Sequence, residues 1–260
     1  MIWIGTSGFQ YPEWKGNFYP EKMPASAMLP YYARHFPTTE INYTFRQLPS
    51  DKTLSNWLRQ TPEHFRFTLK ALQRITDFQR LKNCEELMQA FTAAALKLGS
   101  KRGALLFQLP PSFKRDLPVL NDFLSLLPKS VTAAFEFRDE SWFCDSTYDA
   151  LRRHNATLCI AESEKLRTPA EFTGTAGYFR LRRVDYTTPE LHHWAEIIRE
   201  QASRLDDIYV YLKCRNSMRM SPCELDKNVP MGRDAVATRL PHGDINNEPE
   251  RTETNDGDGG

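Results

Sequence analysis

The sequence predicts an α/β protein of the TIM-barrel-like (β/α) barrel class, and three observations support this prediction. The chain has 260 residues, 40% of them hydrophobic, which suits the roughly 250 residues of such a barrel. Short segments rich in β-branched and aromatic residues alternate with helical ones, and repeated strand-then-helix units imply parallel pairing. An open doubly wound sheet would alternate in the same way, but the first turn, GTSGF, lacks the GxGxxG pattern of that fold.

Eight segments have the length and residue types of β-strands. They are Ile2–Gly5, Thr39–Thr44, Arg66–Ala71, Gly103–Leu109, Thr132–Arg138, Ala156–Glu162, Gly177–Arg182 and Asp207–Lys213. Helices are expected at Ala25–Phe36, Asp51–Gln60, Glu85–Leu98, Leu117–Leu127, Ser146–His154 and Pro189–Arg204, several of them opened by Ser, Asp or Pro. The connection between the sixth and seventh strands contains no convincing helix.

The periodic pattern ends after Lys213. We therefore expect residues 1–213 to form the barrel domain and residues 214–260 to be a disordered C-terminal tail. The eighth helix of a complete barrel is then missing or replaced by this tail. The chain has 34 basic and 33 acidic residues, of which the tail holds six and nine, so the 28 basic and 24 acidic residues of the barrel give it a net charge of +4. This charge mildly favours an anionic ligand.

The composition also indicates a compartment and argues against metal chemistry. The chain opens on a strand-like segment without the basic start of a signal peptide, and it has no run of about 18 apolar residues. We expect a cytoplasmic protein without membrane association. The five cysteines are scattered and never spaced as CxxC, which predicts reduced thiols and no zinc site. The histidines fall before strands or on a helix, away from any mouth, so we expect no metal and no cofactor.

Side chains alternate across a barrel strand, and the apolar set marks the face toward the helices. In the segment Ala133-Ala134-Phe135-Glu136-Phe137-Arg138 this rule sends Glu136 and Arg138 into the lumen near its C-terminal mouth. The same rule gives the inward-facing residues of four other strands. They are Glu40, Asn42 and Thr44; Arg66, Thr68 and Lys70; Tyr178, Arg180 and Arg182; and Tyr209, Tyr211 and Lys213, while Gln108 ends the fourth strand.

Two carboxylates and about five cations thus converge on a mouth where an unpaired buried charge costs several kcal/mol. One interpretation is a purely structural lattice in which Glu40 and Glu136 neutralise the cations. The other is a site for a phosphate or carboxylate group, which arginine grips with a bidentate fork. The surplus of cations favours the second interpretation.

Residues of the predicted loops extend this candidate site. Thr6 and Ser7 follow the first strand, where hydroxyls and backbone N–H groups can hold an anion or simply form a tight turn. Tyr11, Trp14 and Trp142 lie in loops above the mouth, where they would stack on a ring or pack as a lid. Gln108 precedes a stiff Pro110-Pro111 pair and can present its amide to the lumen.

Several motifs in order, GTSGFQYPEWKGNFYP, EINYTFRQLP, FRFTLKALQRIT, GALLFQLPPSF, EFRDESWF and YVYLK, resemble the DUF72 (YecE-like) family. The resemblance runs from Met1 to about Lys213 and implies a TIM-barrel-like fold without an assigned activity. It also implies a closing helix after the last strand, which this sequence does not show. The family-typical positions include Glu40, Asn42, Lys70, Gln108, Glu136 and Arg138.

Several functions are compatible with these residues. We expect a small anionic ligand at the mouth, with possible hydrolase chemistry in which Glu136 or Glu40 is the general acid or base. A glycosidase would use the same two carboxylates, but the surrounding cations make this less natural. The alternatives are a metal-assisted phosphodiesterase, for which the histidine ligands are missing, and a non-catalytic module that binds a nucleotide or nucleic acid.

Overall fold

Eight parallel strands close into a barrel in sequence order, β1 to β8, in a computed structural model that describes residues 1–163, 166–183 and 186–213. The strands are β1 (Ile2–Ser7), β2 (Thr38–Ile41), β3 (Arg66–Lys70), β4 (Arg102–Gln108), β5 (Ala133–Glu136), β6 (Thr157–Glu162), β7 (Ala176–Leu181) and β8 (Asp207–Leu212). Every neighbouring pair is parallel. The predicted (β/α) barrel is confirmed.

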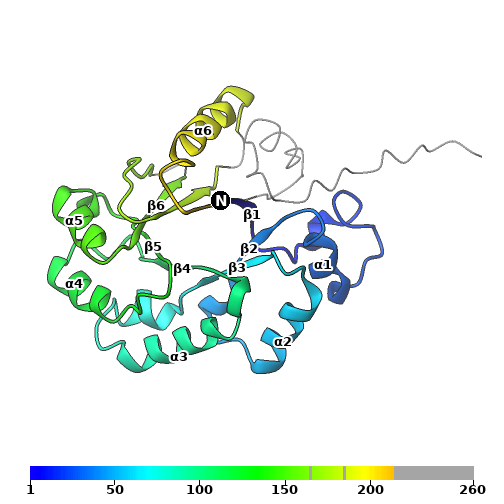
Figure 1. Ribbon diagram of the computed structural model, residues 1–260, viewed down its shortest axis with the longest axis horizontal. Helices are drawn as coiled ribbons and strands as arrows, with labels where there is room; N and C mark the ends of the chain where they lie inside the picture. Colours follow the sequence, from blue (N-terminus) through cyan, green and yellow to red (C-terminus); the bar gives the residue numbers. More distant parts are fainter. Residues whose placement is uncertain (164–165, 184–185, 214–260) are drawn as a thin grey trace, which may run out of the picture.

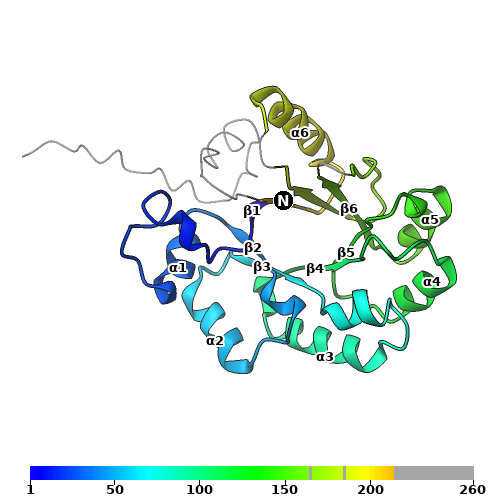
Figure 2. The same ribbon diagram turned by 180° about the vertical axis from the view of Figure 1, so that it is seen from behind.

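Helices surround the barrel and follow one another around it (Figures 1 and 2). They are α1 (Ala25–Tyr32), α2 (Asp51–Gln60), α3 (Glu85–Leu96), α4 (Leu117–Ser125), α5 (Asp145–Arg153) and α6 (Thr188–Gln201). Shorter helical turns cover Pro12–Trp14, Tyr43–Phe45, Arg74–Phe78, Gly99–Lys101 and Glu140–Trp142. Among the described residues, no helix connects β6 to β7, as the sequence predicts, and the expected tail lies outside them.

Most predicted elements end one to four residues earlier than expected, and α1 and β2 are among those that differ most. Helix α1 stops at Tyr32 rather than Phe36, and the chain continues as a turn in which the N–H groups of Arg34 and His35 donate to the carbonyl oxygens of Tyr31 and Tyr32. Strand β2 ends at Ile41, and the chain then turns through the short helix Tyr43–Phe45. The prediction that Thr44 points inward from a strand is therefore wrong: its hydroxyl donates to the carbonyl oxygens of Ile41 and Lys70 instead.

The first strand is longer than predicted and includes Thr6 and Ser7, which the sequence places in the following turn. Its close approach to β2 depends on Gly5, where a Cβ would lie 2.0 Å from the carbonyl oxygen of Thr38. Because a side chain there would push the two backbones apart, glycine allows β1 and β2 to pair in this register.

The hydrophobic core lies mainly between the barrel and its helices. One large cluster joins α1 to α5 with the outward faces of β2 to β6, and a smaller one joins α6 with β6, β7, β8 and β1. A third cluster fills the lower lumen. It contains Trp3, Ala104, Leu106, Ala134, Cys159, Tyr178, Tyr209 and Tyr211. The lumen is thus packed from below, and charged side chains line its C-terminal end.

Candidate functional site at the barrel mouth

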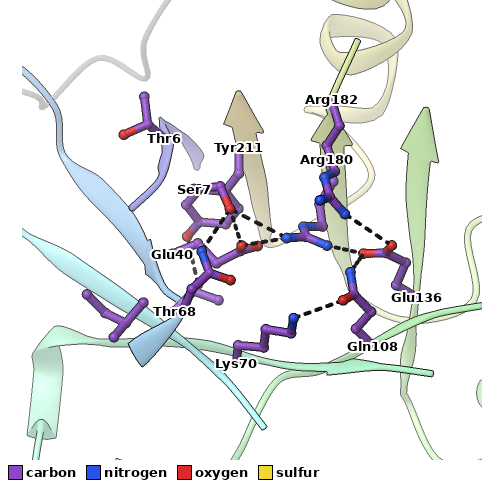
Figure 3. A network of polar contacts seen from close by, with 12 residues as sticks. Thr6, Ser7, Glu40, Thr68, Lys70, Gln108, Glu136, Arg180, Arg182 and Tyr211 are labelled. Carbon is purple, nitrogen blue, oxygen red and sulfur yellow. Dashed lines mark hydrogen bonds and ion pairs between the residues drawn. The ribbon is translucent and has the colours of Figure 1, made fainter. Parts of the chain in front are cut away.

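Polar side chains from β1, β2, β3, β4, β5 and β7 converge at the C-terminal end of the lumen (Figure 3). Alternation along the strands brings them together, because every second residue faces the axis. Ser7, Glu40, Lys70, Gln108, Glu136 and Arg180 all lie here and are all buried. The inward orientation predicted from the sequence for Glu40, Lys70, Glu136 and Arg180 agrees with this arrangement.

Arg180 lies at the centre of the network, between the two glutamates. Its Nη2 is 2.8 Å from Oε1 of Glu40, and its Nη1 donates to Oε2 of Glu136. The arginine side chain is only 2% exposed. Burial alone would raise the pKa of each carboxyl and favour its neutral form, but the Arg180 guanidinium together with the other donors around each carboxylate outweighs this effect. Both glutamates are held ionised. Of the guanidinium atoms, Nε has no hydrogen-bond partner among the described residues.

Glu40 receives two more hydrogen bonds besides the one from Arg180. The Ser7 hydroxyl donates to Oε1 at 2.5 Å, and the Tyr178 hydroxyl donates to Oε2 at 2.7 Å. Asn42 in turn donates to the Ser7 hydroxyl oxygen at 3.0 Å. These bonds lower the pKa of Glu40 further, and they occupy both carboxylate oxygens from within the protein.

Glu136 is surrounded by donors from the neighbouring strands. Gln108 donates from Nε2 to Oε2 at 2.8 Å, Arg138 Nε lies 2.9 Å from Oε1, and Arg182 Nη1 lies 3.7 Å from the same oxygen. Although burial acts in the opposite direction, Arg180, Arg138 and Arg182 together lower the pKa of Glu136 to about 2. The two outer arginines remain accessible, with 34% and 23% of their side chains exposed.

Lys70 is the one mouth cation that forms no ion pair with a carboxylate of the described residues. Its Nζ donates to Oε1 of Gln108 at 2.8 Å and lies 3.9 Å from the centre of the Phe45 ring. Burial, and then the positive charge of Arg180, lower its pKa to about 8. A buried ammonium beside a guanidinium is costly, so this corner of the mouth carries uncompensated positive charge.

Below the charged layer, hydroxyl groups connect β2, β3 and β8. Tyr211 lies 2.8 Å from the Thr38 hydroxyl and donates to the Thr68 hydroxyl at 2.6 Å. Every member is buried, so this chain of hydrogen bonds closes the lumen beneath Glu40 and Lys70.

The predicted loop residues have mixed positions. Thr6 faces α1, where its backbone N–H and its hydroxyl both donate to the Tyr32 hydroxyl, so it is not part of the mouth. Tyr11 donates to the carbonyl oxygen of Ser7 and packs against Trp14. Trp14 and Trp142 are buried. Trp142 stacks on Phe137 and donates to a main-chain carbonyl.

Sequence reasoning missed several functional partners. It placed Tyr178 in the lumen without linking its hydroxyl to Glu40, and it began β2 one residue too late to include Thr38. Thr38 could have been found from its position two residues before Glu40, because alternate residues of a strand face the same side. Sequence reasoning took Glu136 and Arg138 as the first residues of the mouth, whereas Arg180 makes the central contacts. Which strands face each other across the lumen cannot be read from a single strand.

Other kinds of site have little support in the part of the chain that the structure describes. No three His, Cys, Asp or Glu residues there lie close enough together to hold a metal ion. No helix in these segments is long and apolar enough to cross a membrane. Cys84, Cys144 and Cys159 are free thiols.

Comparisons with known proteins identify a matching family and a related protein. The model of a family described as "Protein of unknown function DUF72" matches residues 3–224. The UPF0759 protein YunF of Bacillus subtilis (strain 168) is 30% identical over 157 residues, 57% of this chain and 55% of YunF. The match therefore spans about half the length of that relative.

Two solved structures share the fold. A DUF72 family protein from Thermotoga maritima is similar with a TM-score of 0.76 and 29% identity, covering 86% of this chain and 96% of that one. Another, from Enterococcus faecalis V583, has a TM-score of 0.72 and 19% identity over 90% of this chain and 97% of that one. At 19% identity, the second similarity is evidence for the fold only.

Proposed function

Because this chain belongs to the DUF72 family, whose function is unknown, we propose a function from the site itself: the barrel mouth binds a small anion that carries a phosphate or carboxylate group. The observation that carries this proposal is Lys70, which is buried without a carboxylate partner among the described residues. An anion beside its ammonium would supply the missing negative charge and raise the pKa of Lys70 toward its ordinary value.

The charge balance of the mouth supports the same ligand. Four cations, Lys70, Arg138, Arg180 and Arg182, surround two carboxylates, Glu40 and Glu136. Arg180 forms ion pairs with both glutamates and is only 2% exposed, whereas Arg138 and Arg182 are partly exposed. We assign the ligand contacts to Lys70, Arg138 and Arg182. Arg180 and the glutamates then form the rigid base on which these three cations are held.

The electrostatics favour binding over acid–base catalysis by the glutamates. A general acid or base works best with a pKa near the operating pH, whereas the pKa of Glu136 is about 2 and that of Glu40 is also lowered. If the mouth does catalyse hydrolysis, Lys70, with a pKa of about 8, is better suited to exchange a proton. A glycosidase is disfavoured because the Arg180 guanidinium occupies the space between the two carboxylates.

Binding of a nucleotide or nucleic acid at the mouth has weaker support. That function needs exposed rings above the mouth on which bases can stack. Trp14 and Trp142 are buried in the core instead, which leaves Tyr11 as the partly exposed ring of the three. The observations therefore favour a small anion over a stacked base at this position.

Calorimetric titration with inorganic phosphate, sulfate and citrate tests the proposal. We expect at least one of these anions to bind, and Lys70→Met and Arg182→Met each to weaken that binding about tenfold or more, since hydrogen bonds to charged groups are worth about 1.5–3 kcal/mol. Lys97→Met is the matched control, because Lys97 is exposed and pairs with Asp51 on the outside of the barrel. Anion affinity that is unchanged in both mouth variants would contradict the proposal.

A further inference from the structure

A cavity of about 830 Å³ lies among the loops that follow β3, β4 and β5. Its wall is formed by residues 78–80, Lys82, residues 112–118 and Ser146, and it includes none of the mouth residues. The volume is within the range of about 300–1,000 Å³ that is usual for small-molecule sites. The cavity is therefore a separate feature of the C-terminal side of the barrel.

The wall of this cavity is strongly basic. It contains Arg80, Lys82, Lys114 and Arg115 against a single carboxylate, that of Asp116. Lys82 lies 3.6 Å from that carboxylate. Arg80 donates instead to the neutral hydroxyl of Ser112 at 3.3 Å. The cavity thus has more guanidinium and ammonium groups than its own acid can neutralise.

Arg115 is positioned by the beginning of α5. Its backbone N–H donates to the Ser141 hydroxyl at 2.9 Å, and its Nη1 lies 3.2 Å from the Ser146 hydroxyl and 2.8 Å from the Cys144 sulfur. Although burial acts in the opposite direction, hydrogen bonds from Ser146, Thr147 and Arg115 lower the pKa of Cys144 to about 6. These contacts hold Arg115 in place at the wall of the cavity.

The β3 loop has the most unusual backbone among the described residues. It runs through a π-helical turn, Arg74–Phe78, and then places Arg80, Leu81 and Asn83 at φ values of 48°, 67° and 50°. Non-glycine residues rarely adopt such values, and they concentrate at functional sites because the surrounding fold must hold them there. Two of these three residues flank Lys82, so the left-handed segment is what presents cations to the cavity.

An exposed aromatic ring completes the cavity. Phe78 is 71% exposed, the highest value for a large hydrophobic side chain among the described residues, and it lines the same wall. Nothing in the packing of the core requires a phenylalanine there. A ring of this kind, beside guanidinium groups, is suited to stack on a planar heterocycle.

We propose that this loop cavity binds a nucleoside phosphate, with the phosphate held by Arg80 and Arg115 and the base stacked on Phe78. The class of ligand follows from the two kinds of group present. Inorganic phosphate would use the cations and leave Phe78 without a role, and an uncharged nucleoside would use the ring and leave the cations unneutralised. A ligand with both parts, joined by a sugar, satisfies both walls of the cavity.

Titration of the full chain carrying Arg182→Met, which weakens anion binding at the mouth, with 5′-AMP, adenosine and inorganic phosphate tests the proposal. We expect 5′-AMP to bind at least tenfold more tightly than either fragment. Arg80→Gln and Arg115→Gln should each weaken 5′-AMP about tenfold, as expected for a charge-assisted hydrogen bond. Phe78→Ala should weaken 5′-AMP several-fold, since stacking on an aromatic side chain is worth about 1–3 kcal/mol, and leave phosphate binding unchanged.

Controls separate this site from the mouth and from loss of folding. Arg182→Met, at the mouth, and Lys97→Met, on the outer surface, should leave 5′-AMP affinity unchanged. Because Phe78 is exposed, Phe78→Ala remains informative even if the arginine variants fold poorly. Absence of 5′-AMP binding, binding that is indifferent to Phe78 and Arg115, or binding that is lost in Arg182→Met would each overturn the proposal. A 5′-phosphorylated trinucleotide that binds with the same dependence on Phe78 and Arg115 would support it and identify the end of a strand as a further source of the ligand.

Discussion

The barrel mouth and the loop cavity are both basic and lie on the same side of the molecule, but they hold their charges differently. At the mouth, the side chains of Glu40, Glu136 and Arg180 stand on strands, are buried, and are joined by ion pairs centred on Arg180. In the cavity, cations stand on loops, and Arg80 contacts the neutral hydroxyl of Ser112. We therefore expect folding to depend more on the buried charges of the mouth than on the charges of the cavity.

The largest effect should come from removing the central cation. In Arg180→Met, two buried carboxylates lose their partner, and breaking a buried pair costs about 3–5 kcal/mol. Urea unfolding should show a loss of at least this size, or a chain that does not fold. Adding Glu136→Gln to this variant should recover part of the loss, because one buried negative charge disappears. A loss below about 1 kcal/mol would show that the mouth network does not support the fold.

Acid should act on the mouth through Glu136. Its pKa falls from the ordinary 4.5 to about 2 on folding, so its contribution to stability is fully present above pH 4.5 and is lost as the pH falls toward 2. This contribution is worth up to about 3 kcal/mol. Urea unfolding between pH 5 and pH 2 should therefore give a flatter pH dependence for Glu136→Gln than for the wild type. Parallel curves would contradict the assignment.

Lys70 should oppose folding at neutral pH, in contrast to its neighbours. Its pKa falls from the ordinary 10.5 to about 8 on folding, so the destabilisation is fully present below pH 8 and diminishes as the pH rises toward 10.5. In the absence of anions, the free energy of unfolding of Lys70→Met at pH 7 should be about 1–2 kcal/mol higher than that of the wild type. This difference in free energy of unfolding between the variant and the wild type should be smaller at pH 10. A less stable Lys70→Met at pH 7 would place Lys70 in a structural lattice.

The cavity should show the smallest effects on stability. Phe78 is exposed, and surface substitutions away from special features usually change stability by less than about 0.5 kcal/mol. Phe78→Ser should therefore unfold at the same urea concentration as the wild type, in contrast to Arg180→Met. A loss above about 1 kcal/mol would mean that Phe78 packs in solution and is not available to a ligand.

The sequence predicted most of what depends on local pattern. Alternation along β5 and β7 was enough to place Glu136 and Arg180 in the lumen, because side-chain direction in a strand has a fixed period of two. The failures occur where strands end. The turn after Ile41 removes Thr44 from the lumen, since parity carries no information once the backbone leaves the strand.

Pairing across the lumen and burial in the loops could not be predicted. Arg180 contacts Glu40, 140 residues away in the sequence, and which strands face each other depends on barrel closure. The sequence left open whether the tryptophans of the loops stack on a ligand or pack as a lid, and the structure shows Trp142 covered by Phe113 and Phe137. The exposed ring, Phe78, comes just before a segment with left-handed backbone at Arg80, Leu81 and Asn83. This segment contains no glycine, so the sequence did not indicate its conformation.

The pairing of β1 with β8 has a consequence for how the protein is made. These strands contact each other over five residue pairs, and Trp3 donates to Asp207, 204 residues later. At the usual pace of translation, about 5–20 residues per second, β1 waits roughly 10–40 s for its second neighbour. During this time a hydrophobic strand edge is exposed to other nascent chains. Yield of soluble protein should therefore depend on chaperones and on synthesis rate more than on equilibrium stability.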